Sequence, residues 1–321
     1  MTRRLAVLIP LALVLAGCDR EPPPLPPVDV AVHRDSVEAW KASRQKAIYG
    51  PSGWATVLGL WWVEPGEVTI GADSSNRVTL PRDHSPSRVG SVFINKDSTW
   101  FVAAKGVKAT LDSVPVTSVR LHSDLEPKAT ILRAGSLMIY YLVREDRGVW
   151  KHALRIKDTA SVARAAAAPF RYFPTDIKWR LQAKFVKSPK PDSLNIISVL
   201  GTETRMSHEG DVHFAVDGAK YSLMVIREPE DHGKDLFVMF TDSTSRKETY
   251  PATRYLWVSP PDSLGRTVVD FNKAYNPPCA FTKFATCPFP PKGNHIGVRV
   301  EGGEWNPHYG EQHAAEKPKD R

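Results

Sequence analysis

Short apolar and alternating runs, separated by turn-forming residues, follow one another along most of the chain and predict β-strands. In the first half they fall at residues 55–63, 68–71, 89–94, 100–103, 116–121, 130–132, 137–143 and 149–156. In the second half they fall at residues 212–216, 219–226, 236–240, 255–258, 267–271 and 296–300. Parallel strands need long crossover connections, and helical patterns do not separate these runs. The pattern therefore predicts a mainly β fold of antiparallel, sandwich-like or barrel-like sheets.

Two loops predict hairpins between neighbouring strands. Asp217 and Gly218 alone separate two alternating runs, which is the strongest short-range signal for a two-residue turn. The polar stretch 144–148 separates the runs 137–143 and 149–156 and predicts a second hairpin with a longer loop.

One short helix is predicted ahead of the strands. Asp35 and Glu38 have the spacing of a capping box at its start. Apolar residues then recur near one face at helical spacing, at Val37, Trp40, Ala47 and Ile48. The turn-forming residues 49–53 end the helix.

The strands divide into two groups at a connector over residues 159–174, where an alanine run meets Pro169 and Pro174. We therefore expect an amino-terminal helix and β unit over residues 35–165 and a carboxy-terminal β unit over residues 166–305. A single continuous sheet system is the alternative. The polar, non-periodic residues 306–321 predict a loose tail.

The amino terminus has the three parts of an export signal. Arg3 and Arg4 precede an apolar run over residues 5–16, and the small residues before Cys18 follow. The run is shorter than the roughly 20 residues that cross a bilayer, so residues 1–17 are a predicted signal peptide. Leu-Ala-Gly-Cys has the order of a lipobox, which makes Cys18 the predicted lipidation site and membrane lipid the predicted partner. A generic signal peptide with a chance cysteine is the alternative.

These features predict an exported lipoprotein, anchored to the cell envelope, whose body lies in the periplasm. Bacterial groups read the residue after the cysteine differently, so Asp19 leaves the choice of inner or outer membrane open. Residues 18–34 contain five prolines between Pro22 and Pro27 and predict an extended linker that lifts the body off the membrane.

The chain is basic, with a formal charge of +8 that falls to +6 when Arg3 and Arg4 leave with the signal peptide. Outside the cytoplasm such a balance favours anionic lipid headgroups or acidic wall polymers over nucleic acid, and we predict no nucleic-acid partner. The basic residues are interspersed with acidic ones, which also fits an ordinary mixed surface.

Common catalytic fingerprints are missing: the chain has no nucleophile elbow, phosphate loop, dinucleotide-binding motif or Cys-x-x-Cys pair. His208 and His213 lie five residues apart, as do His308 and His313, whereas a helical metal motif needs a spacing of four. We therefore predict no metal site and no cofactor.

Cys279 and Cys287 lie eight residues apart in a proline-rich loop. Outside the cytoplasm such a pair most simply forms a disulfide, which closes a small loop. Two buried thiols, or a reactive cysteine activated by a basic neighbour, are the alternatives.

An unusual number of polar side chains lies among aromatics and prolines from Arg254 onward. One interpretation is that they satisfy the backbone of a long irregular loop. The other is a pocket in which charged and amide groups bind a ligand between aromatic walls. The candidate binding or catalytic residues are Arg254, Asp270, Asn272, Tyr275, Asn276 and Glu304, with Arg88, Arg155 and Asp158 as further candidates.

The same region carries a resemblance. Residues 249–251, 254–256, 269–281, 285–291, Asn294 and 301–304 resemble the bacterial and archaeal family known only as domain of unknown function 1684. Upstream, residues 53–54, 57–62, 88–90, 155–158, 173–174 and 240–244 extend the resemblance over nearly all of the mature chain. Phe289 and His295 depart from the residues common in the family. The resemblance implies no reaction, because the family has none established.

Three functions fit these observations. The first, which we favour, is an envelope protein that binds a small polar or sugar-like ligand near residues 272–276. The second is a hydrolase with Asp270 or Glu304 as the base, or a thiol enzyme with Cys279 as the nucleophile. The third is a structural or assembly lipoprotein without a ligand. Convergence of the candidate residues on one concave surface distinguishes the first two from the third.

Overall fold

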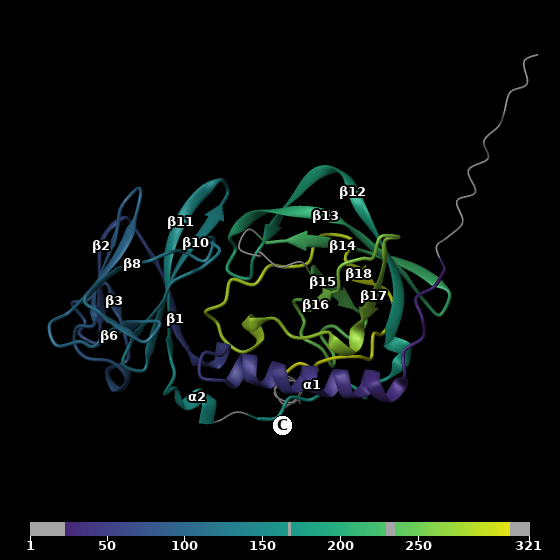
Figure 1. The fold of residues 1–321 in the computed structure, drawn as a ribbon, viewed down its shortest axis with the longest axis horizontal. Coiled ribbons are helices and arrows are strands. Elements are labelled where there is room, and N and C mark those ends of the chain that lie inside the picture. The colour runs from purple at the N-terminus through teal and green to yellow at the C-terminus, as the bar shows by residue number, and fades with distance from the viewer. Residues whose placement is uncertain (1–22, 166–167, 229–234, 309–321) are drawn as a thin grey trace, which may run out of the picture.

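A computed structural model describes residues 23–165, 168–228 and 235–308 of the chain. It is mainly β, as the sequence predicts, with two β units side by side along the long axis (Figure 1). The predicted signal peptide and the lipidation site at Cys18 lie outside the described residues.

Helix α1 (Val30–Tyr49) begins six residues earlier than predicted. Its N-cap is Asp29, whose Oδ1 accepts hydrogen bonds from the backbone N–H groups of Ala31 and Val32 at 2.8 and 3.0 Å. Asp35 therefore lies inside the helix, and the predicted linker ends sooner than residue 34. No helix in the described part of the chain is long and apolar enough to cross a membrane.

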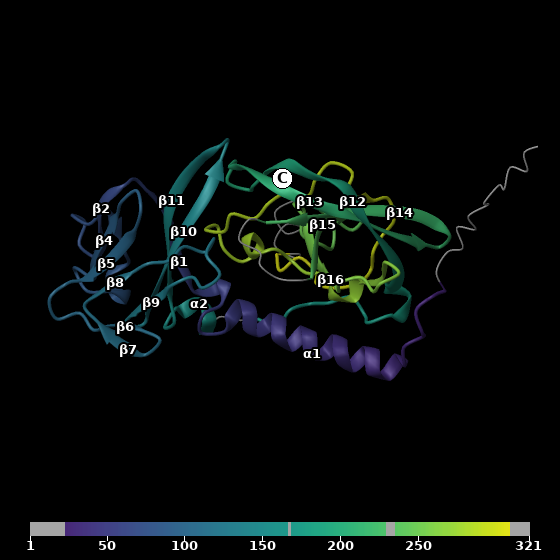
Figure 2. The same ribbon diagram turned by 45° about the horizontal axis from the view of Figure 1, so that its top comes forward.

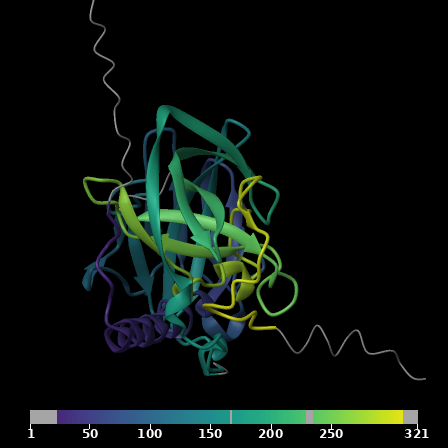
Figure 3. The ribbon, with the colours of Figure 1, turned by 90° about the vertical axis from the view of Figure 1, so that its right-hand side faces the viewer.

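The helix packs along the carboxy-terminal β unit, although its place in the sequence predicted that it would belong to the amino-terminal unit. Figure 3, viewed from the end formed by the carboxy-terminal unit, shows α1 beneath the sheets of that unit. Ion pairs join His33 to Asp270 at 2.9 Å and Arg44 to Glu304 at 2.7 Å. These contacts bridge more than 200 residues of sequence, so no local pattern could reveal them.

The amino-terminal unit is a β-sandwich that follows helix η1 (Trp54–Thr56). One sheet has the order β1-β11-β10-β9-β6-β7 and the other β3-β2-β4-β5-β8. The strands are β1 (Val57–Val63), β2 (Gly66–Gly71), β3 (Val78–Thr79), β4 (Gly90–Ile94), β5 (Thr99–Ala103), β6 (Ala109–Leu111), β7 (Val114–Val116), β8 (Ser118–Arg120), β9 (Ile131–Ala134), β10 (Leu137–Asp146) and β11 (Val149–Asp158). Helix η2 (Arg82–His84) lies between β3 and β4.

Both sheets contribute to one core between them. Val68, Ile70 and Phe101 from one sheet pack with Leu132 and Ile156 from the other, and all are fully buried. Phe101 and Leu132 alternate with exposed residues, in the period-two pattern that predicted these strands.

The β10–β11 hairpin extends from the sandwich toward the carboxy-terminal unit (Figure 2). Only Arg147 and Gly148 form its turn, both with positive φ, so the predicted five-residue loop is shorter and the strands longer. At the tip, the Arg147 N–H donates to the Glu203 carbonyl at 2.9 Å, and the Glu203 N–H donates to Asp146 Oδ1 at 3.1 Å. The tip therefore joins the two units.

The carboxy-terminal unit follows the short helices α2 (Val162–Ala165) and η3 (Ile177–Trp179). A four-stranded sheet has the order β14-β13-β12-β17, and a smaller one has the order β16-β15-β18. The elements are β12 (Arg180–Ile197), β13 (Glu203–Val216), β14 (Ala219–Arg227), β15 (Leu236–Asp242), β16 (Arg254–Val258), β17 (Arg266–Asp270), η4 (Phe271–Lys273), η5 (Pro278–Ala280) and β18 (His295–Ile296). Asp217 and Gly218 form the predicted turn between β13 and β14.

Strand β12 was not predicted, although it is the longest strand described. Its sequence is polar and contains Pro189 and Pro191, which argue against a strand. The pairing with β13 shifts between Lys187 and Asp192, so both prolines fall in an irregularity where a lost ladder hydrogen bond is tolerated.

Both ends of the described chain are held more firmly than the sequence suggests. The Leu25 N–H donates to Gln182 Oε1 at 2.8 Å, and Gln182 Nε2 donates to the Leu25 carbonyl at 3.1 Å. The proline-rich segment thus lies against β12. At the other end Asn306 is buried and donates its N–H to the Glu248 carbonyl at 2.8 Å, so the predicted tail cannot begin there.

Candidate functional site

Asp270 and Asn272 belong to a buried hydrogen-bond network. Asp270 Oδ2 lies 2.9 Å from His33 Nε2, while Oδ1 accepts from the N–H and the side-chain amide of Asn272 at 3.2 and 2.9 Å. Asn272 Oδ1 accepts from the Asp176 N–H at 3.0 Å, and Nδ2 donates to the Asp176 carbonyl at 2.9 Å. Both side chains therefore satisfy the protein's own groups.

Glu304, Asn276 and Tyr275 form a second network around Arg44 of α1. The guanidinium donates to both Glu304 oxygens, at 2.7 and 3.4 Å, and to the Asn276 carbonyl at 3.2 Å. It also lies 4.3 Å from the centre of the Tyr275 ring. Glu304 Oε2 accepts a further hydrogen bond from the Asn276 N–H at 2.8 Å. Burial raises the pKa of the Tyr275 hydroxyl.

Arg254 is fully buried in the centre of the carboxy-terminal unit. Its guanidinium donates to Asp242 at 3.4 Å and to the carbonyls of Val300, at 3.1 Å, and Gly302. Burial lowers the pKa of Arg254, and the charge of Asp242 opposes this shift. Arg254 thereby ties the chain near residue 300 to strands β15 and β16.

These networks separate the candidate residues that the sequence suggested would converge. Arg254 lies in the centre of the unit, Asp270 and Asn272 lie under the start of α1, and Asn276 and Glu304 lie under Arg44. Their contacts agree with the interpretation in which polar groups satisfy an irregular loop. None of these five residues lines the cleft between the two β units that is described below.

Arg88 and Asp158 lie in the amino-terminal sandwich. Arg88 is half-exposed and donates to Ser91 Oγ at 3.1 Å and to Glu67 at 3.5 Å. Asp158 is fully buried, and its Oδ1 accepts from the Ala160 N–H at 2.9 Å. Neither joins the groups around Arg254.

Arg155, in contrast, lines a cleft of about 290 Å³ between the two β units. The amino-terminal unit and the segment before it contribute four lining residues, Trp54, Asp124, Arg144 and Arg155. The carboxy-terminal unit contributes Glu228, Tyr255, Pro278, Ala285, Thr286, Cys287 and Pro288. This cleft is the candidate site, because it combines charged, aromatic and sulfur-bearing side chains on one concave surface.

The charges of the cleft include both signs. Arg144 Nη2 lies 2.7 Å from Asp124 Oδ2, and the Val143 N–H donates to Asp124 Oδ1 at 3.2 Å. The Arg155 guanidinium lies 4.8 Å from the centre of the Trp54 ring, at a distance typical of cation–π contact. The site therefore offers guanidinium donors, a carboxylate acceptor and aromatic surface.

Lys157 lies beside Arg155 on β11 and holds Trp54 in place. Its ammonium group is 5.1 Å from the centre of the Trp54 ring and donates to the Ser52 carbonyl at 2.7 Å. Burial and, after it, the positive charge of Arg155 lower the pKa of Lys157 to about 8. A buried lysine with such a pKa is common at functional sites but also occurs in structural networks.

Cys279 and Cys287 meet at the wall of the cleft as free thiols, not as the predicted disulfide. The backbone N–H of Cys279 donates to Cys287 Sγ at 3.1 Å, so the residues are in contact although their sulfur atoms are not bonded. A hydrogen bond from the Cys287 thiol lowers the pKa of the Cys279 thiol. Burial raises the pKa of the Cys287 thiol.

Among the described residues, no group of three or more His, Cys, Asp or Glu side chains is arranged to hold a metal ion. Sequence reasoning missed Trp54, Asp124, Arg144, Glu228 and Lys157 as parts of one region. The only available signal was that Trp54 and Arg155–Asp158 belong to segments that carry the family resemblance.

Residues 168–305 match a family described as "Protein of unknown function (DUF1684)". The match begins at residue 168, so the upstream segments between residues 53 and 158 lie outside it. No curated protein matches the chain.

Two solved structures illustrate what the chain resembles. An uncharacterized protein of Haloarcula marismortui, solved by NMR, is 30% identical over 44% of this chain and 79% of its own, with a TM-score of 0.38. The FHA-2 domain of a Mycobacterium tuberculosis ABC transporter is 14% identical over 28% of this chain and 76% of its own, with a TM-score of 0.21. Neither TM-score is high enough to establish a shared fold.

Proposed function

Since residues 168–305 belong to the DUF1684 family, which is defined without a reaction, we propose a function from the cleft: it binds a small, sugar-like polar ligand. The observation that carries this proposal is the composition of one concave surface. Trp54, Arg144 and Arg155 face Tyr255 and Cys287 across it. The ligand site proposed here therefore replaces the one expected near residues 272–276.

The lining suits a ligand with several hydroxyl groups. A hydroxyl both donates and accepts hydrogen bonds, so it can use guanidinium donors and carboxylate acceptors together. Arg144 and Arg155 supply the donors, and Asp124 and Glu228 supply the acceptors. The rings of Trp54 and Tyr255 supply apolar surface for the carbon skeleton of a sugar. A volume of about 290 Å³ limits the ligand to a small molecule.

Calorimetric titration with a defined panel tests the proposal. The panel contains hexoses, amino sugars, uronic acids and their disaccharides, each titrated into the mature protein. We expect at least one member to bind, and Arg155→Met to weaken its binding by about 10- to 100-fold, because a hydrogen bond to a charged group is worth roughly 1.5–3 kcal/mol.

Arg88→Met is the matched control, since Arg88 is a half-exposed arginine in the same β unit and does not line the cleft. It should leave the dissociation constant unchanged. Failure of the whole panel to bind, or equal losses in the two variants, would contradict the proposal.

A second candidate function is a thiol enzyme, favoured by the lowered pKa of Cys279 beside the cleft. It predicts that iodoacetamide alkylates Cys279 before Cys287, whose burial suppresses the thiolate. Cys279→Ser would then abolish a turnover that Arg155→Met only weakens. Equal, slow alkylation of both thiols would remove the basis of this candidate. The hydrolase hypothesis has less support, because Asp270 and Glu304 are paired with His33 and Arg44.

The cellular setting that we propose is the cell envelope, with the mature chain anchored through acylated Cys18 and its body in the periplasm. The lipobox sequence ending at Cys18 supports this placement. Mass spectrometry of the native amino-terminal peptide tests it: cleavage before Cys18 and a mass increase from acyl chains are expected. An intact amino terminus without fatty acid would overturn the placement. Cys18→Ser should release the protein from the membrane fraction.

A further inference from the structure

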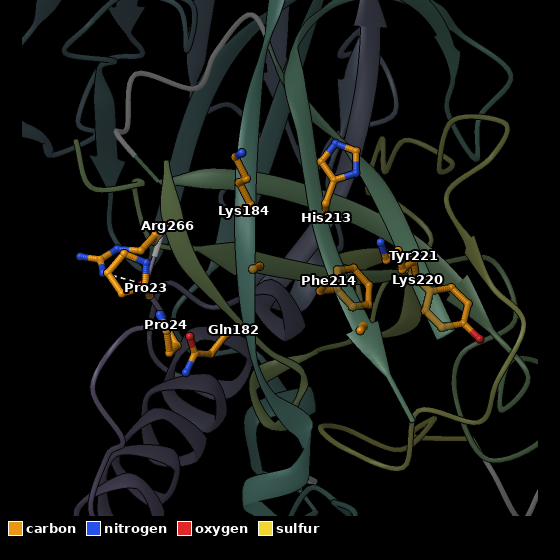
Figure 4. A pocket seen from close by; sticks show the side chains of 11 residues that line it. Pro23, Pro24, Gln182, Lys184, His213, Phe214, Lys220, Tyr221 and Arg266 are labelled. Atoms are coloured by element: carbon orange, nitrogen blue, oxygen red, sulfur yellow. Dashed lines mark hydrogen bonds between the residues drawn. The ribbon is translucent and has the colours of Figure 1, made fainter. Parts of the chain in front are cut away.

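A second cavity, of about 500 Å³, is an open groove on the outer face of the four-stranded sheet (Figure 4). Its lining includes Pro23, Pro24, Lys184, His213, Lys220 and Arg266. Lys184, Lys220 and Arg266 bring three positive charges to the lining, and no described residue that lines the groove is acidic. The groove therefore has the character of an anion-binding surface.

The sheet register aligns three of these side chains across adjacent strands. Lys184 of β12 lies opposite Arg266 of β17 on one side and opposite His213 of β13 on the other. Like charges directly opposite each other in a sheet are destabilising. A row of this kind is therefore expected where an external anion offsets the repulsion.

The charges in the row are balanced only at one end. Arg266 binds Asp262 at 2.7 Å and donates to the Pro23 carbonyl at 2.8 Å. Lys184, His213 and Lys220 are exposed, and their side chains make no hydrogen bond or ion pair with another described residue. The ammonium groups of Lys184 on β12 and Lys220 on β14, on either side of β13, are thus available to a partner.

The proline-rich segment fixes where the groove lies relative to the predicted anchor. Pro23 and Pro24 form one wall of the groove, held by the bonds of Arg266 to Pro23 and of Gln182 to Leu25. Pro23 follows Cys18 by five positions, and five Cα-to-Cα steps span at most about 18 Å. An acylated Cys18 would therefore keep this face of the sheet close to the membrane surface.

We propose that this groove is a docking surface for the anionic headgroups of a phospholipid bilayer, with Lys184 and Lys220 facing the lipid phosphates. The inference rests on the proposed anchoring at Cys18. It adds that the body is oriented on the membrane with the β17-β12-β13-β14 face toward the headgroups. The positive groove and the negative bilayer surface are complementary in charge. The segment between Cys18 and Pro23 is too short to let this face of the sheet move far from the membrane.

Vesicle co-sedimentation tests the surface separately from the anchor. The mature chain, residues 18–321 with Cys18→Ser, carries no acyl group and contains every described residue. We expect it to bind vesicles of phosphatidylcholine with 30% phosphatidylglycerol at low salt, to bind pure phosphatidylcholine much less, and to dissociate as salt is raised. The double variant Lys184→Glu with Lys220→Glu should bind at least about 25-fold more weakly, because loss of each basic side chain alone accounts for about fivefold and the new carboxylates repel the anionic surface.

The control variant Lys105→Glu with Lys108→Glu makes the same charge change at exposed lysines of the amino-terminal unit. Its affinity for anionic vesicles should stay within about twofold of that of the parent. An equal loss of affinity in both double variants would show that only net charge matters, and would overturn the proposal. Absence of binding to anionic vesicles would overturn it as well. Glycerol phosphate at 10 mM could also displace the protein from vesicles more than sodium chloride does at equal ionic strength. That result would identify a soluble phosphate ester, and not the bilayer, as the ligand of the groove. The proposed anchor is tested separately, by mass spectrometry of acylated Cys18 in the native protein.

Discussion

The pairing of Arg44 with Glu304 predicts that one substitution in α1 destabilises the carboxy-terminal unit. Arg44→Met keeps most of the apolar stem but removes the guanidinium. Glu304 then loses its partners at 2.7 and 3.4 Å, and its side chain is fully buried. Among the described residues, only the Asn276 N–H, at 2.8 Å, still donates to the carboxylate.

The expected cost follows from the burial of the charge that is left behind. Breaking a buried ion pair on one side costs roughly 3–5 kcal/mol, because the remaining charge is neither solvated nor paired. The contact of Arg44 with the Tyr275 ring, at 4.3 Å, is lost in addition. We therefore expect the free energy of unfolding to fall by about 3 kcal/mol or more.

Urea unfolding followed by circular dichroism measures this loss as a lower midpoint at an unchanged m-value. Arg34→Met is the control: Arg34 is an exposed arginine of the same helix, so its removal should change stability by less than about 0.5 kcal/mol. Glu304→Gln added to Arg44→Met should restore part of the loss, since it removes the unpaired charge. A loss below about 1 kcal/mol for Arg44→Met, or no recovery in the double variant, would refute this account of the ion pair.

Three further predictions concern the helix cap, a closely packed glycine and Lys157. Asp29→Ala removes the N-cap of α1 and should cost about 0.5–2 kcal/mol in the same urea assay, with no loss if water caps the helix equally well. Gly303→Ala should cost clearly more than Gly135→Ala, because both glycines have positive φ but only at Gly303 would a Cβ lie 2.1 Å from a backbone carbonyl; equal costs would contradict this. Lys157 has a folded-state pKa lowered from 10.5 to about 8, so the unfolded state binds more protons between these values and stability rises with pH there. The stability of the parent relative to Lys157→Met should therefore rise by roughly 2 kcal/mol from pH 7 to pH 10, and a flat difference would show that Lys157 is solvated.

The fold could be predicted where it depends on local pattern. Asp217 and Gly218 specify a two-residue turn almost by themselves, and alternation specifies which face of each neighbouring strand is buried. Strand β12 was missed for an equally local reason, since Pro189 and Pro191 contradict a strand until the shift in register beside them is known. The start of α1 was misplaced because Asp29 and Asp35 are both plausible caps, and only the contacts of the first turn distinguish them.

The candidate site depends on contacts that no local pattern contains. Asp270, Asn276 and Glu304 were noticed because polar residues among aromatics are unusual, yet their partners His33 and Arg44 lie on a helix more than 200 residues away. Without those partners, a buried structural carboxylate and a catalytic one have the same sequence signature. The cleft was missed because Trp54 and Arg155 are far apart in the sequence, where neither is unusual. They meet only after the sandwich has folded.

The proposed membrane surface and the proposed ligand cleft lie at opposite ends of α1. The helix begins just after the proline-rich wall of the groove and ends shortly before Trp54 in the cleft, and its 20 residues span about 30 Å. Ion pairs from His33 and Arg44 fix it along the carboxy-terminal unit, so it acts as a rigid spacer between the two sites. The cleft would then lie at the end of the helix away from the proline-rich wall of the groove. Charge reversal at Lys184 and Lys220 should accordingly weaken vesicle binding without changing the affinity of the cleft for a sugar, and a parallel loss of both would mean that the two surfaces are coupled.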